Sequence, residues 1–186
     1  MKTGTRLDVE IGWDGTRHRF RMNNASGTQV LSLYTDASSQ TSNVWQHIIC
    51  SWDLGTAGNR KIYIDGVDKT AQLVFTTGQT IHYESTNVYV IAGAAHTIAA
   101  FDLAEVYFTV PAAYFDLATA GNREKFRSAG GLPVDLGSDG STPTGTQPYV
   151  YLKSPFSSFG VNSGSGGNFT TNGTGGTGYI STTPPP

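Results

Sequence analysis

Apolar and polar residues alternate most clearly between residues 44 and 66, in two strand-sized runs joined by a short polar loop. In the first run, residues 44–52, apolar side chains fall on both alternating faces, which predicts a strand buried on both sides. In the second run, residues 61–65, one face is apolar and we expect the other to lie near water. Asp65-Gly66 then predicts a hairpin turn, because glycine accepts a positive φ without a Cβ clash.

The N-terminal residues predict two more strands and a second hairpin. Residues 7–13 alternate apolar with polar side chains, and residues 14–15, Asp-Gly, supply a turn. The return strand places Arg17, Arg19 and Arg21 on one face. We interpret that face as solvated, with contact to an acidic or phosphate-bearing partner as the alternative.

Strand-sized segments continue along the chain, separated by clusters of Gly, Ser, Thr and Asn at a spacing of roughly 8 to 12 residues. They span residues 30–34, 73–75, 81–83, 87–92 and 98–108. Helix-like periodicity is scarce and glycine is abundant, which favours strands joined by turns. The sequence therefore predicts an all-β fold, an antiparallel β-sandwich.

The last third of the chain has a different composition. Asp116 is a candidate N-cap for a helix over residues 117–129, which Gly130-Gly131 would end. From residue 154 onward Gly, Ser, Thr and Pro dominate, and such a segment cannot build a core alone. We expect three parts: a sandwich over 1–112, a helix and an ordered Pro/Gly-rich loop packed on it over 113–153, and an extended tail over 154–186.

Length and composition narrow the functional classes. A chain of 186 residues can bury one sizeable core. Its formal net charge of -2, with Lys and Arg scattered except for Arg17, Arg19 and Arg21, argues against nucleic-acid binding. Cys50 is the only cysteine and falls inside a predicted strand, so we interpret it as a small core residue. No apolar run approaches the roughly 20 residues of a membrane helix, and the N-terminus lacks the apolar core of a secretion signal, so no membrane partner is expected.

The stretch over residues 44–66 resembles the signature of laminin G-like, concanavalin A-like β-sandwich domains. The residues that carry the resemblance are Trp45, His47, Ile49, Trp52, Asp53, Tyr63, Ile64, Asp65 and Gly66. Such domains form two curved antiparallel sheets packed face to face, a jelly roll, and they bind sugars, proteins or lipids or serve as virion parts. The resemblance implies more N-terminal strands than residues 7–34 supply. Either the sandwich is abbreviated, or a neighbouring subunit covers an apolar sheet.

A second resemblance lies in the C-terminal third. Residues 122–169 are similar to a segment recurrent in tailed-bacteriophage structural proteins that carry laminin G-like domains: an Asn-Arg-x-x-Phe helix, a Pro- and Gly-rich loop, an aromatic strand and a glycine-rich run. Together the two resemblances cover about residues 44–173. The matching positions in the second are Asn122, Arg123, Phe126, Pro133, Val134, Leu136, Gly137, Asp139, Gly140, Pro143, Gly145, Asn162, Gly166, Gly167 and Phe169.

Backbone chemistry favours order in that loop. Pro133, Pro143 and Pro148 fix φ, and Asp139 followed by Gly140 predicts an Asx-type turn. Such a loop loses little conformational entropy when it becomes ordered.

The phage resemblance implies a virion structural protein of a tailed phage, either a capsid decoration or a head or tail fibre module, that acts by binding. Its implied location is the virion, after assembly in the host cytoplasm. The partners would be capsid or tail proteins of the same virion and further copies of this chain, with a trimer suggested by decoration around symmetry axes. A carbohydrate-binding adhesin is the alternative, compatible with the first if the virion part contacts a host surface glycan. A glycan hydrolase is the weaker alternative.

Aromatic rings are the candidate glycan-binding groups, because apolar sugar faces stack on them while polar neighbours bind the hydroxyls. The candidates are Trp13, Trp52, Tyr89, Tyr107 and Tyr149. Core packing is the alternative for each ring.

No catalytic constellation emerges. Concanavalin A-type glucanases use two glutamates flanking an aspartate on one strand, and the four glutamates here, Glu10, Glu84, Glu105 and Glu124, lack that spacing. There is also no Gly-x-Ser-x-Gly elbow. We therefore expect a protein that is not an enzyme and has no cofactor. Weak calcium candidates near loops are Asp53, Asp65, Asp68 and Asp102, with turn and capping roles as the alternative.

Overall fold

The computed structural model describes residues 7–13, 17–37, 39, 41, 44–56, 58–83, 88–91, 104–110, 113–153 and 158–169, with the backbone alone for 7–13, 72–75 and 88–91. The chain forms two compact units, and each is considered by itself. The first comprises Met1–Ala100 with Asp116–Ala118, and the second Phe101–Phe115 with Thr119–Pro186. The predicted division at residues 112 and 153 is a different partition and stays a prediction.

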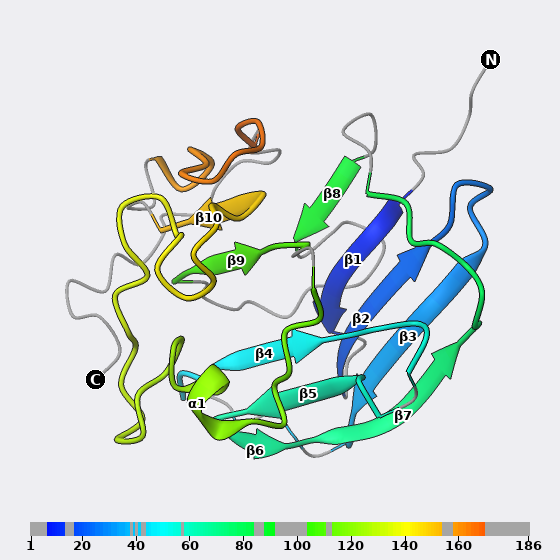
Figure 1. Ribbon diagram of the computed structural model, residues 1–186, viewed down its shortest axis with the longest axis horizontal. Coiled ribbons are helices and arrows are strands. Elements are labelled where there is room, and N and C mark those ends of the chain that lie inside the picture. Colours follow the sequence, from blue (N-terminus) through cyan, green and yellow to red (C-terminus); the bar gives the residue numbers. More distant parts are fainter. Residues whose placement is uncertain are drawn as a thin grey trace. The chain divides into compact units, whose positions relative to one another are not determined.

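The first unit contains a five-stranded sheet in the order β7-β3-β2-β1-β8 (Figure 1). Its pairs are antiparallel except β1 with β8, which is parallel. The alternating residues predicted as strands at the N-terminus therefore pair as expected. The bounds are β1 Leu7–Trp13, β2 His18–Asn23, β3 Gln29–Thr35, β7 Thr70–Phe75 and β8 Val88–Ile91.

A three-stranded antiparallel sheet completes the described strands of this unit. Its strands are β4 Ile48–Ser51, β5 Lys61–Ile64 and β6 Val67–Asp68, with β5 in the middle. The predicted hairpin turn is confirmed: Asp65 and Gly66 both have positive φ, 51° and 82°, and β5 pairs with β6 on either side of them.

The core of the first unit follows from the alternation. Phe20 lies opposite Leu33 and Met22 opposite Leu31, so these four side chains share one face of the large sheet. All four are buried, with Leu31 and Leu33 fully so. Contacts between β3 and β5 bring the two sheets together, and Ile62 and Ile64 of β5 are buried as well.

The face of β2 that carries the arginines differs from its prediction. Arg19 is only 8% exposed, so the interpretation of this face as solvated is wrong at its centre. Its register partner is Tyr34, and the Arg17 guanidinium lies over the Tyr34 ring at 4.6 Å from the centroid. The guanidinium groups meet protein atoms because aliphatic stems and planar heads can pack on aromatic rings.

The region around Trp45 is also less buried than its alternation predicts. Val44 is 60% and Trp45 40% exposed, and the strand begins only at Ile48. In β5 the opposite error occurs, since Tyr63, expected near water, is buried. Alternation identifies the two faces of a strand, but long-range packing decides which of them is covered.

Residues 81–83, expected to form a strand, are not in one, although Ile81 is buried. Of the predicted segment 98–108, residues 98–103 lie outside the described residues, and Val106–Phe108 forms a strand, β9. It pairs antiparallel with β10, Val150–Leu152, in the second unit instead of closing the described sheets of the first.

The predicted helix over residues 117–129 is much shorter than expected. Helix α1 spans only Ala120–Arg123, and its N-cap, Thr119, makes no side-chain capping bond. Asp116 instead accepts a hydrogen bond from the Ala118 amide at 2.8 Å, which holds a turn. Beyond the helix, the Ser128 side chain binds both backbone polar groups of Leu132, and such local bonds compete with helix formation. No helix among the described residues is long and apolar enough to cross a membrane.

Candidate functional site

Two of the candidate glycan-binding rings are engaged within their own units. The Trp52 indole N–H donates a hydrogen bond to the Tyr83 hydroxyl at 2.8 Å, and the ring is half-buried. Tyr107 packs edge-on against Phe126 and Tyr151, with centroid distances of 5.1 and 6.2 Å. Burial raises the pKa of Tyr107, as expected for a phenol in a packed cluster. These rings contribute to packing.

Tyr149 is the candidate ring that remains open to solvent. It is 52% exposed, at the residue preceding β10. The side chains of Trp13 and Tyr89 lie outside the described residues. Within the second unit, the described candidates therefore supply one accessible ring, Tyr149, together with the half-buried Tyr107.

The calcium candidate Asp53 organises the loop between β4 and β5. Its Oδ1 accepts a bond from the Gly55 amide at 2.7 Å, and its Oδ2 accepts one from the Asn59 amide group at 3.2 Å. The Gly55 bond, followed by one from the Thr56 side chain, holds the pKa of Asp53 below its usual value. The carboxylate thus has a turn-forming role of the kind expected as the alternative to metal binding.

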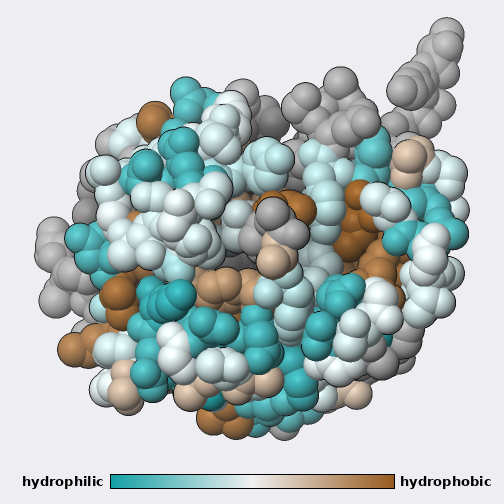
Figure 2. All heavy atoms as spheres, viewed as in Figure 1, coloured by the Kyte–Doolittle hydropathy of each residue, from teal (hydrophilic) through white to brown (hydrophobic). Residues whose placement is uncertain are grey.

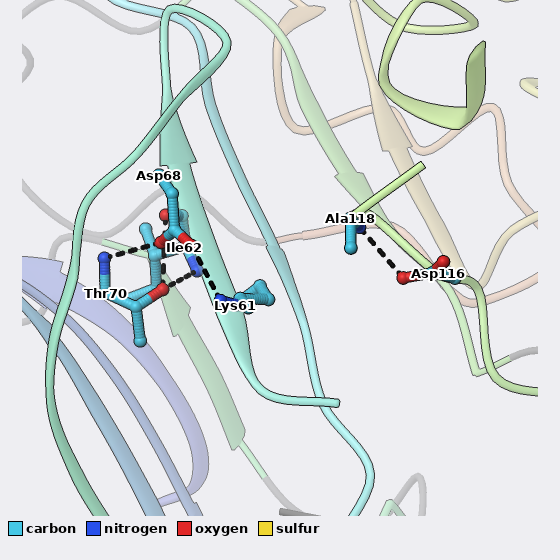
Figure 3. Close-up of polar contacts among 6 residues, drawn as sticks. All are labelled: Lys61, Ile62, Asp68, Thr70, Asp116 and Ala118. Carbon is cyan, nitrogen blue, oxygen red and sulfur yellow. Dashed lines mark hydrogen bonds and ion pairs between the residues drawn. The ribbon is translucent and has the colours of Figure 1, made fainter. Parts of the chain in front are cut away.

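Asp65 and Asp68 are also occupied by nearby donors. Asp65 Oδ1 accepts a bond from the His47 amide at 3.1 Å. Asp68 forms an ion pair with Lys61 at 2.7 Å and accepts a bond from the Thr70 amide, as Figure 3 shows. Asp102 lies outside the described residues. Among the residues that the structure describes, no group of three or more metal-ligating side chains comes together.

In the second unit the loop that follows α1 is ordered by backbone contacts. The predicted Asx turn is confirmed, with the Ser141 amide donating to Asp139 Oδ1 at 3.0 Å. Gly140 has φ +79°, and a Cβ on it would lie 2.9 Å from both Pro148 and the Tyr151 ring. Only glycine supplies this conformation and this closeness at once. The motif residue Leu136, in the same loop, is buried.

The glycine-rich run after β10 returns alongside it, and we call residues 160–169 the strap. Its centre is Asn162, whose Oδ1 accepts bonds from the amides of Tyr151 at 2.7 Å and Gly164 at 2.9 Å. Its Nδ2 donates to the carbonyls of Tyr149 at 2.8 Å and Gly167 at 3.3 Å. All four hydrogen-bonding positions of the carboxamide are used. Sequence analysis placed Asn162 in the phage-like segment without assigning it a role, although an Asn followed by Ser-Gly is a signal of such local backbone binding.

Among the described residues, large apolar side chains are exposed in both units, one at a time along the chain except for the adjacent Val44 and Trp45. They are Val44, Trp45, Val67, Val110, Leu132, Tyr149 and Val161. On the face drawn in Figure 2 apolar residues form separate areas set among hydrophilic ones. Scattered exposure of this kind is normal for a protein surface and does not by itself mark a binding site.

A family model described as the concanavalin A-like lectin/glucanases superfamily matches residues 2–108. The chain belongs to this superfamily. The match confirms the predicted fold class, because the structure is mostly antiparallel strands with almost no helix. No curated protein and no solved structure matches the chain significantly. The superfamily match ends at Phe108, the last residue of β9, so the loop, β10 and the strap lie beyond it.

Proposed function

We propose that the chain is a virion structural protein of a tailed phage, a capsid decoration or a head or tail fibre module that works by binding. The observation that carries this proposal is the segment 122–169, which resembles a recurrent phage segment and whose described residues, 122–153 and 158–169, belong to the second unit. The superfamily match supports the laminin G-like part of the proposal and leaves the virion context to experiment.

The roles of the recurring residues support a structural motif over a catalytic one. Gly140 admits the Tyr151 ring, Asp139 closes a turn, and Asn162 binds backbone groups of Tyr149 and Tyr151 along one edge of β10. Each role holds the module together. A motif of this kind is what we expect of an appended module that acts through its shape in an assembly.

Binding without catalysis also fits the described polar side chains of the first unit. Asp53 and Asp68 accept hydrogen bonds from their own loop or hairpin, and Asp65 accepts one from the His47 amide, which leaves all three engaged in structure. We therefore propose that the protein is not an enzyme. Its partners would be capsid or tail proteins of the same virion and further copies of the chain, with a trimer as the working arrangement.

Copurification with particles tests the proposal. We expect the protein to be present in density-purified phage particles at a fixed ratio to the major capsid protein, and an image of the particle to locate it. Recovery only from the particle-free lysate would contradict the virion assignment.

A carbohydrate-binding adhesin is the second candidate, favoured by the superfamily match and by the exposed ring of Tyr149. A glycan array tests it, with Tyr149→Ala as the variant and Val161→Ala, also on the surface of the second unit, as the control. A glycan-binding signal that falls tenfold or more for Tyr149→Ala, but not for Val161→Ala, would support a sugar platform at Tyr149. An array without signal would remove this candidate. Hydrolysis of the same glycans, lost on replacement of single glutamates, would favour a hydrolase instead.

A further inference from the structure

The outer edge of β10 is covered by the strap. On one side β10 pairs with β9, and on the other its neighbouring carbonyls accept bonds from the strap backbone. The Ser163 amide donates to the Tyr151 carbonyl at 2.9 Å, and the Gly166 amide to the Tyr149 carbonyl at 2.9 Å. The strap thus satisfies the edge in the way that a third strand would.

The Asn162 carboxamide takes the place of one residue of a neighbouring strand in this arrangement. It accepts from the amide of Tyr151 and donates to the carbonyl of Tyr149, the two groups that flank Val150. In a parallel pair of strands, the N–H and C=O of one residue, which belong to two successive peptide groups, make the same pair of bonds. Two further strap donors, the amide and hydroxyl of Ser165, bind the carbonyl of Pro148.

Close approach of the strap depends on two glycines. A Cβ on Gly164 would lie 2.6 Å from the Pro148 carbonyl oxygen, and one on Gly166 would lie 2.7 Å from the Tyr149 carbonyl oxygen. Both atoms belong to the backbone and cannot move aside easily. A Cβ on Gly167 would meet nothing within 4 Å. The chain therefore offers a substitution that excludes the strap and a neighbouring one that does not.

The strap is held by hydrogen bonds more than by apolar burial. Val161 is 48% exposed, residues 165–168 are exposed, and Phe159 and Phe169 are only half-buried. Net stabilisation from exposed backbone hydrogen bonds is modest, so such a segment opens at lower free energy than a packed core.

We propose that the strap is exchangeable between copies of this chain, so that the strap of one copy covers the β10 edge of a second copy. The occupant is identified by the contacts already described, because the segment that fits this edge is present in every copy. Exchange keeps every bond between strap and edge, with the strap supplied by the second copy. The inference concerns the second unit alone and does not depend on the virion assignment.

Concentration decides between the closed and the exchanged form. A segment on a short connection experiences an effective concentration on the order of 1 mM at its own edge. Dilute chains therefore keep their own straps, whereas copies held together in an assembly can exchange them. The exchanged form links neighbouring copies without any new interface chemistry.

Refolding of the full chain at two concentrations tests the proposal. Light scattering after size exclusion gives the mass. Hydrogen exchange of the Tyr151 and Ser163 amides, which are bonded between β10 and the strap, shows whether the edge is covered in the dimer. Refolding at about 1 mM should yield a dimer that is absent after refolding at about 10 μM. Gly164→Ala should lower the dimer fraction at least tenfold, and Gly167→Ala should not. Absence of any dimer, or equal dimer in both variants, overturns the proposal.

Discussion

The two units of this protein are ordered by different kinds of interaction. In the first, apolar side chains on alternating positions of β2, β3 and β5 form a core in which Leu31, Leu33 and Ile62 are fully buried. In the second, the loop and strap are ordered largely by bonds between side chains and backbone, of which those of Asp139 and Asn162 are examples. Burial of apolar area stabilises the first unit. In the second unit, positive-φ glycines and side chains that use all their hydrogen-bonding positions determine the path of the loop and strap.

The difference shows which substitutions each unit should tolerate. A core stabilised by the burial of apolar side chains is sensitive to loss of side-chain volume, because removed methylene groups leave a cavity. A loop ordered by close backbone approach is sensitive to added atoms, since a single Cβ at Gly140 or Gly164 meets atoms that cannot yield. The following predictions test this contrast, beginning with the largest effect.

Leu33→Ala should lower the free energy of unfolding of the first unit by about 2–5 kcal/mol, because Leu33 is fully buried opposite Phe20. All three tryptophans belong to the first unit, so urea unfolding followed by tryptophan fluorescence reports on it. Val67→Ala, at a position that is 56% exposed, is the control and should change stability by less than about 0.5 kcal/mol. Equal changes in the free energy of unfolding for the two variants would mean that burial of apolar area does not stabilise this unit.

Gly140→Ala should destabilise the second unit by roughly 2–4 kcal/mol, through backbone strain at φ +79° together with contact on Pro148 and Tyr151. Gly145→Ala is the matched control. It has a similar φ, +75°, but its Cβ would meet nothing within 4 Å, so only the strain of about 1 kcal/mol remains. Hydrogen exchange of the Tyr151 amide measures the destabilisation caused by each variant. Equal destabilisation by Gly140→Ala and Gly145→Ala would show that the close approach at Gly140 contributes nothing.

Asn162→Asp should weaken the strap by about 1–3 kcal/mol, because a carboxylate oxygen then faces the Tyr149 carbonyl where an N–H donated. Exchange of the Tyr151 amide should become roughly 10- to 100-fold faster. Asn168→Ala removes only the hydrogen bond that the Asn168 side-chain oxygen accepts from the Asn162 backbone N–H, so it should have a smaller effect. Tryptophan fluorescence should report no change in the first unit, and a large change there would contradict the separation of the two kinds of order.

Lys61→Met should have the smallest effect, below about 1 kcal/mol, because the ion pair with Asp68 is partly exposed. Burial raises the pKa of Asp68, but hydrogen bonds from Lys61 and Thr70 outweigh it and hold the pKa below its usual value. The stabilisation of the folded state by this ion pair is therefore fully present above the unfolded pKa of about 3.9. It is lost as the pH falls through the lower pKa that Asp68 has in the folded state. Urea unfolding at pH 7 and pH 3 should show a smaller difference in the free energy of unfolding between the variant and the parent at pH 3. A larger difference at pH 3 would contradict this.

The sequence by itself determined the all-β class, the strands β1, β2, β3 and β5, and the turns at Asp65-Gly66 and Asp139-Gly140. These features are local: a period of two defines the faces of a strand, and glycine next to aspartate defines a tight turn within a few residues. The helix over 117–129 failed for a local reason as well, since Ser128 and Asp116 bind nearby backbone groups and favour turns.

Only the tertiary structure decided which faces are covered and which strands pair. The alternation around Arg19 and around Trp45 is equally regular, yet Arg19 is buried and Trp45 is exposed, because coverage depends on elements distant in sequence. The pairing of β9 with β10 and the attachment of the strap through Asn162 depend in the same way on contacts between separated segments. A residue carries its backbone preferences wherever it stands, but its neighbours in space exist only once the chain has folded.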